Sequence, residues 1–339
     1  MRLTRNDIRL ALPSKGPLAE GALDLLDEVG LRVFKPNPRQ FQATIPSLPG
    51  LTVLFQRAGD IVVGVREGSV DFGITGWDMV AERRGRNGRI LALLPELGFG
   101  HCSLNLIVPD DWTAVRKVSD LVDYEMSSGL PLRIATKFPN LAREFLDQRG
   151  VHDVDLIPAE GTLEIAPTIG YADAIVDLVS TGTTLRDNRL RILEDGLILR
   201  SQACLIANHK ALKNRSDVLA VARQLLEFIV AHLRAKENVA IFANVRGETP
   251  TAIAERMSSM SVIGGLQGPT ISPVITKDSQ GWFAIHIIVR KNRLAQAIAE
   301  LREIGGSGVV VTPVTYIFEE EPEAYTAMLA AIAVDDASA

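Results

Sequence analysis

The segment ADAIVDLVSTGTTLR, residues 172–186, indicates how this chain folds. An apolar run of strand length ends in a small, hydroxyl-rich turn, which leads toward a possible helix. The same alternation of short apolar runs and amphipathic segments extends over residues 1–215. Alternation of this kind is typical of α/β proteins with mostly parallel sheets and right-handed crossovers.

Short apolar runs and helical periodicity place the elements of this first region. We expect strands at residues 8–12, 70–74, 103–109, 132–136, 154–159 and 172–179. We expect helices after Pro17, at residues 61–65 and 77–84, near Glu164, and from a cap at Asn140 to Gly150. The sequence therefore predicts a repeated strand–helix architecture.

The region after residue 215 has a different order. Residues 216–236 follow a 3.6-residue apolar period, with Asp217 at the start and Lys236 at the end, and predict a helix. Strands are expected at 239–245, 271–276, 282–290 and 309–316, with helices at 249–260 and 294–304. This βαββαβ order predicts a ferredoxin-like module. Residues after Glu319 are acidic and alanine-rich, and we expect a tail of little structural consequence.

Composition excludes several classes of protein. The chain has 339 residues, of which 47% are hydrophobic and 23% charged, and two to three domains are expected at about 150 residues each. Two cysteines, Cys102 and Cys204, are too few for a disulfide-rich secreted module. A net charge of −5 and a pI near 5.7 argue against a nucleic-acid partner. Charges interrupt the N-terminus before any long apolar run, so we expect no signal peptide, no membrane partner and a cytoplasmic protein.

The turn after residue 179 has the chemistry of a phosphate cradle. Backbone N–H groups and hydroxyls of a small loop after a parallel strand surround one point, and a helix beginning there favours an anion. Asp173 and Asp177 are four residues apart on the preceding strand and should share a face, where they suit ribose hydroxyls or Mg²⁺. By residue type alone, an ordinary turn and helix cap is an equally good interpretation.

The spacing E-x5-G-x-A-x2-I-x-D-L-x2-T-G-x-T-L, from Glu164 to Leu185, resembles the signature of the ATP phosphoribosyltransferase family. Other blocks resemble the family in the same order: ALPSKGPLAE (11–20), QRAGDI (56–61), DFGITGWD (71–78), LGFGHCSL (97–104) and ATKFPNL (135–141). GLQGPTISPV (265–274) resembles the regulatory domain of the family's long form.

This resemblance implies an α/β fold with a two-lobed core like that of type II periplasmic binding proteins, followed by a ferredoxin-like regulatory domain. The implied boundaries are 1–102 with 203–236 for lobe I, 103–202 for lobe II, 237–320 for the regulatory domain and 321–339 for the tail. The chain would cross between lobes near Cys102 and Cys204, with the active site in the cleft.

The resemblance also implies a reaction. N1 of ATP would displace pyrophosphate from C1 of 5-phosphoribosyl 1-pyrophosphate (PRPP), with inversion and with Mg²⁺. N1 has its own lone pair, so no protein nucleophile or general base is named, and alignment and fixed electrostatics should provide catalysis. L-Histidine is the implied inhibitor, and a homo-oligomer, a dimer or hexamer, the implied assembly.

Site residues carry over by matching the motifs. The residues expected to hold PRPP are Ser180, Thr181, Gly182, Thr183, Thr184 and Glu164, and Glu164 could equally cap a helix. The expected catalytic residues are Asp177, Asp173 and Lys15, and the two aspartates are also the expected Mg²⁺ ligands. The expected nucleotide-binding residues are Gly16, Arg57, Asp71, Thr75, Gly76, Arg133 and Lys137. The arginine and lysine side chains among these could equally be ordinary surface charges.

Two positions set limits on the carry-over. Many relatives carry Arg directly after the Lys-Gly pair, but this chain has Pro17, so no contact is assigned to that arginine. Leu266, Gly268 and Thr270 are the expected histidine pocket, although the C-terminal module could instead serve oligomerisation. A non-catalytic phosphoribosyl-ligand sensor or a regulatory paralogue on the same scaffold is the alternative function.

Overall fold

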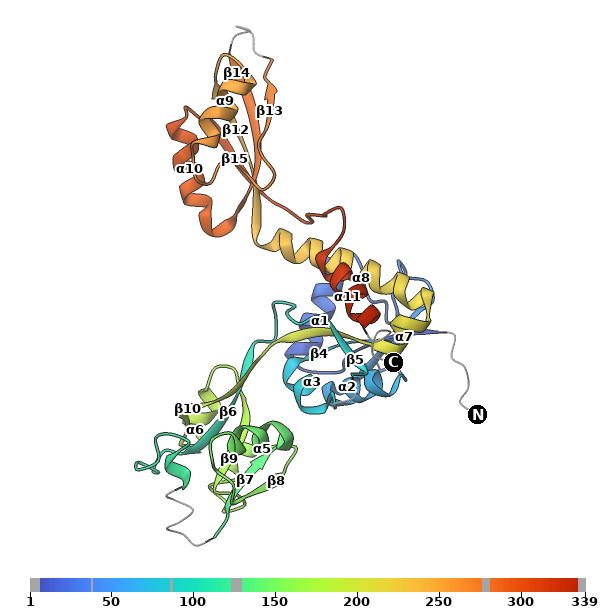
Figure 1. The fold of residues 1–339 in the computed structure, drawn as a ribbon, viewed down its shortest axis with the longest axis vertical. Coiled ribbons are helices and arrows are strands. Elements are labelled where there is room, and N and C mark those ends of the chain that lie inside the picture. The colour runs from blue at the N-terminus through green and yellow to red at the C-terminus, as the bar shows by residue number, and fades with distance from the viewer. Residues whose placement is uncertain (1–6, 38, 86–87, 123–129, 276–280, 335–339) are drawn as a thin grey trace. The chain divides into compact units, whose positions relative to one another are not determined.

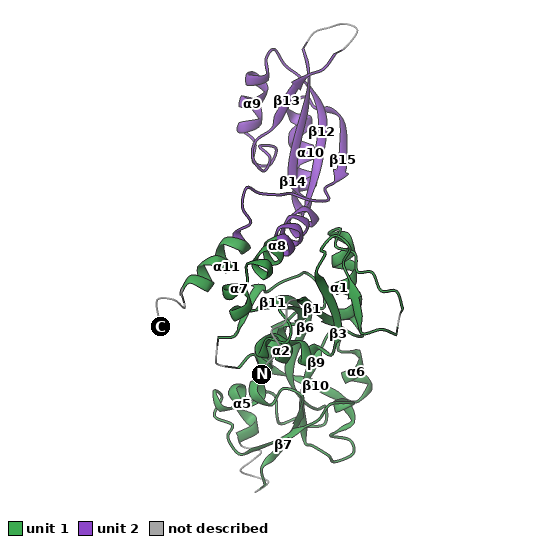
Figure 2. Ribbon diagram, turned by 90° about the vertical axis from the view of Figure 1, so that its right-hand side faces the viewer, with its two compact units in different colours: residues 1–223, 324–339 green, residues 224–323 purple. Residues whose placement is uncertain are grey.

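The structure is a computed structural model that describes residues 7–37, 39–85, 88–122, 130–275 and 281–334. The chain forms two compact units, one of residues 1–223 with 324–339 and one of residues 224–323 (Figure 2). In the described residues the first unit has two sheets and the second has one, and each unit has its own hydrophobic core. The long helix α8 (Ser216–Lys236) begins in the first unit and ends in the second, and its predicted range is confirmed.

The first sheet, with its helices, forms lobe I. Its strand order is β2 (Gln42–Thr44), β3 (Leu51–Gln56), β1 (Ile8–Pro13), β4 (Phe72–Gly76), β11 (Ala203–Asn208) and β5 (Ile90–Leu94). The three strands β3, β1 and β4 are parallel, and each is followed by a helix: α2 (Ala58–Glu67), α1 (Pro17–Glu28) and α3 (Trp77–Arg83). Parallel neighbours require such crossovers, and they bring the carboxyl ends of the strands to one edge.

The second sheet forms lobe II. Its strand order is β10 (Leu190–Ser201), β6 (Cys102–Pro109), β9 (Ala174–Val179), β7 (Leu132–Thr136) and β8 (Val154–Pro158) (Figure 1). Strands β9, β7 and β8 are parallel, whereas β6 and β10 run antiparallel to their neighbours. Helix α5 (Pro139–Asp147) follows β7, the short 3-10 helix η1 (Leu163–Ile165) precedes β9, and α6 (Thr183–Asp187) follows β9.

The mostly parallel arrangement predicted for both sheets is therefore wrong. Each sheet contains three adjacent parallel strands, but β2, β11 and β5 in the first sheet and β6 and β10 in the second pair antiparallel with their neighbours. Strand β6 carries the chain into lobe II, and β10 followed by β11 (Ala203–Asn208) carries it back to lobe I. These connecting strands account for the antiparallel pairs of the second sheet and for that of β11 with β4 in the first.

The second unit confirms the βαββαβ order. Its strands are β12 (Asn238–Arg246), β13 (Thr270–Pro273), β14 (Trp282–Arg290) and β15 (Ser307–Pro313), in the sheet order β13-β14-β12-β15. Its helices are α9 (Pro250–Ser258), the 3-10 helix η2 (Lys291–Arg293) and α10 (Leu294–Glu303). Side chains along β14 alternate between buried and half-buried, so one face of the sheet packs on the core.

Two local predictions are wrong. Asn140 does not cap its helix: α5 begins at Pro139 after Phe138, and the Asn140 side chain bonds to Glu82 instead. Residues after Glu319 are not an inconsequential tail, because Glu323–Val334 form helix α11. Met328 on α11 is only 3% exposed, and the Arg223 guanidinium lies 5.1 Å from the centre of the Tyr325 ring.

Candidate active site

A cleft of about 690 Å³ lies in the first unit where strand ends of the two lobes meet. Lobe I contributes residues 13–15, 18 and 56–60, which follow β1 and β3, and Met79, Glu82 and Arg83 of α3. Lobe II contributes residues 136, 137, 139 and 140 after β7 and residues 158–160 after β8. The carboxyl ends of parallel strands are where ligands bind in open α/β sheets.

Cationic side chains line this cleft from both lobes. Lys15 and Arg57 come from lobe I and Lys137 from lobe II, all predicted from the sequence. Nη1 of Arg57 lies 4.0 Å from Oε2 of Glu160, an ion pair that joins the lobes between two mostly exposed side chains. An exposed pair contributes at most about 1 kcal/mol, so little free energy is needed to separate these two side chains.

The hydroxyl-rich loop lies at the carboxyl edge of the second sheet. Gly182 has φ +72°, a left-handed conformation that favours glycine, and α6 begins directly after it. Oγ1 of Thr181 lies 3.2 Å from Oγ1 of Thr183, and the side chains of Ser180, Thr181, Thr183 and Thr184 are exposed. The loop thus presents hydroxyls to solvent directly before a helix begins, an arrangement that suits a phosphate group.

Asp177 lies just before this loop and is half-buried on β9. Burial raises the pKa of its carboxyl, although the Leu178 N–H and the Lys137 ammonium act in the opposite direction and Glu164 adds to the rise. The charges of Glu164 and Lys137 therefore both act on the Asp177 carboxyl. Lys137 also lines the cleft, so it connects the cleft to the strand that carries the loop.

Two predicted residues lie elsewhere. Arg133 and Asp173 stand at the amino ends of β7 and β9, at the edge of the sheet opposite to the cleft residues 136–137 and 158–160. They bond to each other: Nη2 of Arg133 lies 2.7 Å from Oδ1 of Asp173, and the Arg133 N–H donates to Oδ2 at 2.9 Å. Asp173 directly precedes β9 and Asp177 lies near its carboxyl end, so only Asp177 lies beside the loop. This placement argues against the expectation that the two carboxylates bind the same ligand.

Four other predicted residues shape lobe I. Asp71 is fully buried and accepts the N–H of Arg9 at 2.9 Å, away from the cleft. The buried hydroxyl of Thr75 donates to the Ala58 carbonyl at 3.0 Å, which fixes the start of α2, and Gly76 is the residue before α3. Gly16, with φ +78°, is the residue before α1, and a Cβ there would meet nothing within 4 Å.

The three residues predicted to bind L-histidine lie together on one segment of the second unit. Leu266 is 40% exposed, Gly268 has φ +99°, and Thr270 begins β13. The preceding turn is held by Glu300 of α10, whose carboxylate accepts the N–H groups of Val262 and Ile263 at 2.9 and 3.1 Å. Burial opposes ionisation of Glu300, but these hydrogen bonds and that of Ser261 lower its pKa overall.

Sequence reasoning missed several cleft residues. Gln56, Glu82, Asn140 and Glu160 all line the cleft. Gln56 and Asn140 lie within motif blocks, but Asn140 was considered only as a helix cap, and Glu82 and Glu160 lie outside these blocks. Gln56 ends β3, and that position at a strand's carboxyl end was the available signal. Glu82 had no such signal, because its partner Asn140 is 58 residues away in the chain.

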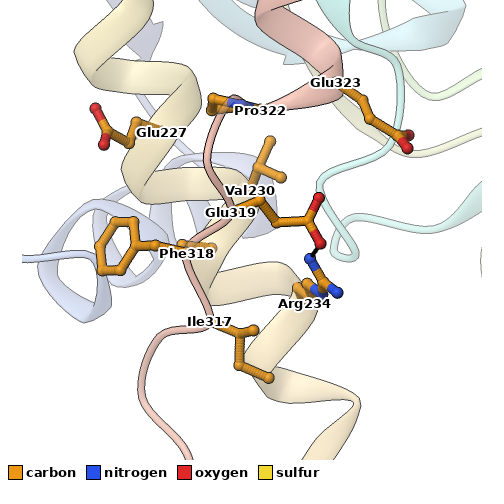
Figure 3. A pocket seen from close by; sticks show the side chains of 9 residues that line it. Glu227, Val230, Arg234, Ile317, Phe318, Glu319, Pro322 and Glu323 are labelled. Atoms are coloured by element: carbon orange, nitrogen blue, oxygen red, sulfur yellow. Dashed lines mark ion pairs between the residues drawn. The ribbon is translucent and has the colours of Figure 1, made fainter. Parts of the chain in front are cut away.

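A second cavity of about 270 Å³ lies inside the second unit. It is lined by α8 residues, including Glu227 and Arg234, and by the segment 317–323 (Figure 3). Arg234 forms an ion pair with Glu319 across it (Figure 3). None of the residues predicted to bind substrate or histidine lines this cavity.

The described residues hold neither a metal-binding cluster nor a membrane-spanning helix. Within the described ranges, no group of three or more His, Cys, Asp or Glu side chains is placed to hold a metal ion. No helix in the same ranges is long and apolar enough to cross a membrane.

Comparison with known proteins identifies the family. The ATP phosphoribosyltransferase family model matches residues 57–233, and that of the HisG C-terminal domain matches residues 235–316. ATP phosphoribosyltransferase 2, chloroplastic, of Arabidopsis thaliana is 42% identical over 96% of this chain and 80% of its own length. The chain belongs to the ATP phosphoribosyltransferase family.

Further relatives agree with this assignment. The ATP phosphoribosyltransferase of Gemmatimonas aurantiaca is 37% identical over 90% of this chain and 97% of its own length. A chain of the ATP phosphoribosyl transferase (HisG:HisZ) complex from Thermotoga maritima is 25% identical, with a TM-score of 0.51 over 66% of this chain and 98% of that chain. The protein is thus an enzyme of phosphoribosyl transfer, and the two-lobed α/β core with an added βαββαβ unit is the expected fold.

Proposed function

We propose that this ATP phosphoribosyltransferase joins N1 of ATP to C1 of PRPP in the cleft between its two lobes. The observation that carries the proposal concerns Lys137, which lines a cationic cleft and whose charge also lowers the pKa of Asp177, the carboxylate beside the hydroxyl-rich loop. PRPP carries a monophosphate, ribose hydroxyls and a pyrophosphate. The loop would bind the monophosphate, the carboxylates would bind the ribose hydroxyls, and the cations would bind the pyrophosphate.

The residues then take separate roles. Loop residues Ser180 to Thr184 hold the ribose 5-phosphate, and Asp177 with Glu164 faces the ribose hydroxyls. Lys15, Arg57 and Lys137 bind the polyphosphates of the two substrates, and Gly16 allows α1 to begin beside them. Thr75 and Gly76 act indirectly, by fixing α2 and α3 under the cleft.

Catalysis by this arrangement consists of alignment and charge stabilisation. N1 of ATP attacks with its own lone pair, the bond from C1 to the pyrophosphate oxygen breaks, and pyrophosphate leaves with the electron pair. The cations of the cleft stabilise charge that grows on the leaving group, and Asp177 faces the ribose as its ring becomes electron-poor. No residue has to remove a proton from N1.

Mg²⁺ fits this site as a metal shared with the substrate. It is usually held by one or two carboxylates together with phosphate oxygens, so the lack of a three-ligand cluster in the described residues does not conflict with it. Asp177 and Glu164 are the carboxylates that would hold it. When bound, Mg²⁺ neutralises pyrophosphate charge.

Regulation, assembly and location extend the proposal. We place an L-histidine site at Leu266, Gly268 and Thr270, and we expect a homo-oligomer, a dimer or hexamer. The cytoplasmic location expected from the sequence stays a prediction, because two Arabidopsis relatives are named as chloroplastic.

Turnover distinguishes the enzyme from a phosphoribosyl-ligand sensor. The purified chain, supplied with ATP, PRPP and Mg²⁺, should release pyrophosphate and form N1-(5-phosphoribosyl)-ATP, identified by mass spectrometry. PRPP binding alone would fit either function and would not decide between them. A folded sample that binds both substrates and forms no product would reject the proposal.

A further inference from the structure

Helix α3 carries two buried carboxylates, Asp78 and Glu82, four residues apart and therefore on one helix face. Their exposed fractions are only 4% and 6%. A buried carboxylate needs hydrogen-bond donors to offset the loss of water. Both residues find their donors on chain segments that belong to or lead from lobe II.

Glu82 binds the first turn of α5 in lobe II. Its Oε1 accepts the Asn140 N–H at 3.0 Å and the Asn140 side-chain amide at 2.8 Å. Its Oε2 accepts the Leu141 N–H at 3.0 Å, and its carbonyl accepts the Asn140 amide at 3.2 Å. First-turn N–H groups of a helix have no partner within that helix, so a side chain of lobe I caps a helix of lobe II.

The other end of α3 binds the strand that connects the lobes. The Ser201 hydroxyl donates to Oδ1 of Asp78 at 2.6 Å and accepts the Asp78 N–H at 2.9 Å. Ser201 is the last residue of β10, where the chain leaves lobe II. Between these two contacts, Met79 packs against the hydrophobic cores of both lobes. Helix α3 is therefore attached to lobe II at three successive points.

We propose that Glu82 is a positioning residue that fixes the opening of the cleft and so aligns the two substrates. This inference rests on the proposed function. The phosphate loop belongs to lobe II and Lys15 and Arg57 to lobe I, so a shift between lobes changes the distance between C1 of PRPP and N1 of ATP. Contacts within each lobe are unchanged by such a shift. Misplacement by about 1 Å can cost about a hundredfold in rate.

The variant Glu82→Gln tests this role with little change in size. Its amide group would face the Leu141 N–H with a second donor, so the cap weakens. We expect kcat to fall about tenfold or more while the Kd for PRPP changes less than about twofold, because the loop and Asp177, which are proposed to bind its monophosphate and ribose, both belong to lobe II. The matched control is Asp147→Asn, at the last residue of α5, whose carboxylate lies 3.4 Å from the exposed His152 ring. The control should keep wild-type kcat.

A rescue experiment separates positioning from general damage. Asn140→Asp places a second carboxylate against Glu82 and should lower kcat in the same way. Combining Asn140→Asp with Glu82→Gln restores a donor opposite an acceptor, and kcat should return to within about threefold of wild type. A double variant no better than either single variant would overturn the proposal.

Hydrogen exchange provides a readout that does not need turnover. The amides of Asn140 and Leu141 should exchange faster in Glu82→Gln than in wild type and in Asp147→Asn. If the wild-type protein showed no turnover, the proposed function would be rejected, but the comparison of amide exchange rates among the three proteins would still test the role of Glu82. Wild-type kcat in folded Glu82→Gln, unchanged exchange at both amides, or equal losses of PRPP affinity and kcat would each reject the role of Glu82.

Discussion

Substitution of Asp177 should lower turnover without lowering the stability of the fold. Burial raises its pKa, so its folded-state pKa lies above the unfolded value of about 3.9. The folded state then binds the proton more tightly, and the free energy of unfolding rises as pH falls through the folded-state pKa. Asp177→Asn removes this cost of ionisation. It should lower turnover about a hundredfold without lowering stability at pH 7, as measured by rates and urea unfolding. A stability loss with full turnover would contradict this role.

The Asp173–Arg133 pair should behave in the opposite way. Burial of Asp173 opposes ionisation, but the Arg133 side chain and N–H outweigh it and lower the pKa of Asp173. A lowered folded-state pKa stabilises the fold above the unfolded pKa, and this stabilisation is lost as pH falls below about 4. Asp173→Asn should reduce the free energy of unfolding at pH 7 by about 1 kcal/mol and leave PRPP affinity unchanged. A large loss of PRPP affinity at unchanged stability would restore its predicted binding role.

Elements with a strong period and clear ends could be predicted from the sequence, and others could not. Leu132–Thr136, Ser216–Lys236 and Trp282–Arg290 match their predicted ranges. The long strand β10 was not predicted, because its burial pattern lacks strict alternation and its register with β6 shifts. The cap at Asn140 was wrong because a distant residue, Glu82, decides where that side chain bonds. Local pattern finds elements, but contacts between lobes need the fold.

Helix α11 shows how packing overrides composition. Its alanine-rich, acidic sequence resembles a tail, yet Met328 is 3% exposed while the neighbouring Leu329 is 39% exposed. Met328→Ala should lower the free energy of unfolding by about 2 kcal/mol, because a buried side chain is truncated. Leu329→Ala is the matched control and should change it by less than about 0.5 kcal/mol. Equal effects of the two variants in chemical denaturation would argue that α11 does not pack as described.

At the scale of the whole molecule, the regulatory proposal needs a full-length test. A chain ending near Lys236 would lose α11 along with the βαββαβ unit, so its loss of histidine sensitivity would be ambiguous. In the full chain, Thr270→Ala removes one hydroxyl from the predicted pocket. It should weaken histidine inhibition severalfold, with inhibition noncompetitive with ATP and uninhibited turnover nearly unchanged. Wild-type inhibition of this variant in steady-state assays would place the histidine site elsewhere.

Part of the candidate site could be predicted from the sequence. A motif marks the loop from Ser180 to Thr184, Asp177, Lys15 and Lys137. In the structure Lys15 and Lys137 line the cleft, and Asp177 and the loop lie at the carboxyl end of β9. Their roles in binding stay predictions. Arg133 was predicted to bind nucleotide, but it lies at the amino end of β7, at the sheet edge opposite to the cleft. The position of a residue along its strand decides which edge of the sheet it reaches. The central claim therefore concerns the loop, whose role in binding depends on its backbone as well as its hydroxyls.

The affinity of the full chain for PRPP, measured for wild type, Gly182→Ala and Gly150→Ala, tests that claim most directly. Both glycines have positive φ, +72° and +76°, and a Cβ at either would meet at most an ordinary contact, so the two substitutions impose a similar backbone strain of about 1 kcal/mol. Gly182 lies in the loop beside Asp177 and Gly150 follows α5, and neither glycine is among the residues that line the cleft. We predict that Gly182→Ala weakens PRPP binding at least tenfold, on the order of 1.4 kcal/mol, while Gly150→Ala binds PRPP as wild type does. Equal PRPP affinities for all three proteins would contradict the assignment of this loop as the phosphoribosyl site.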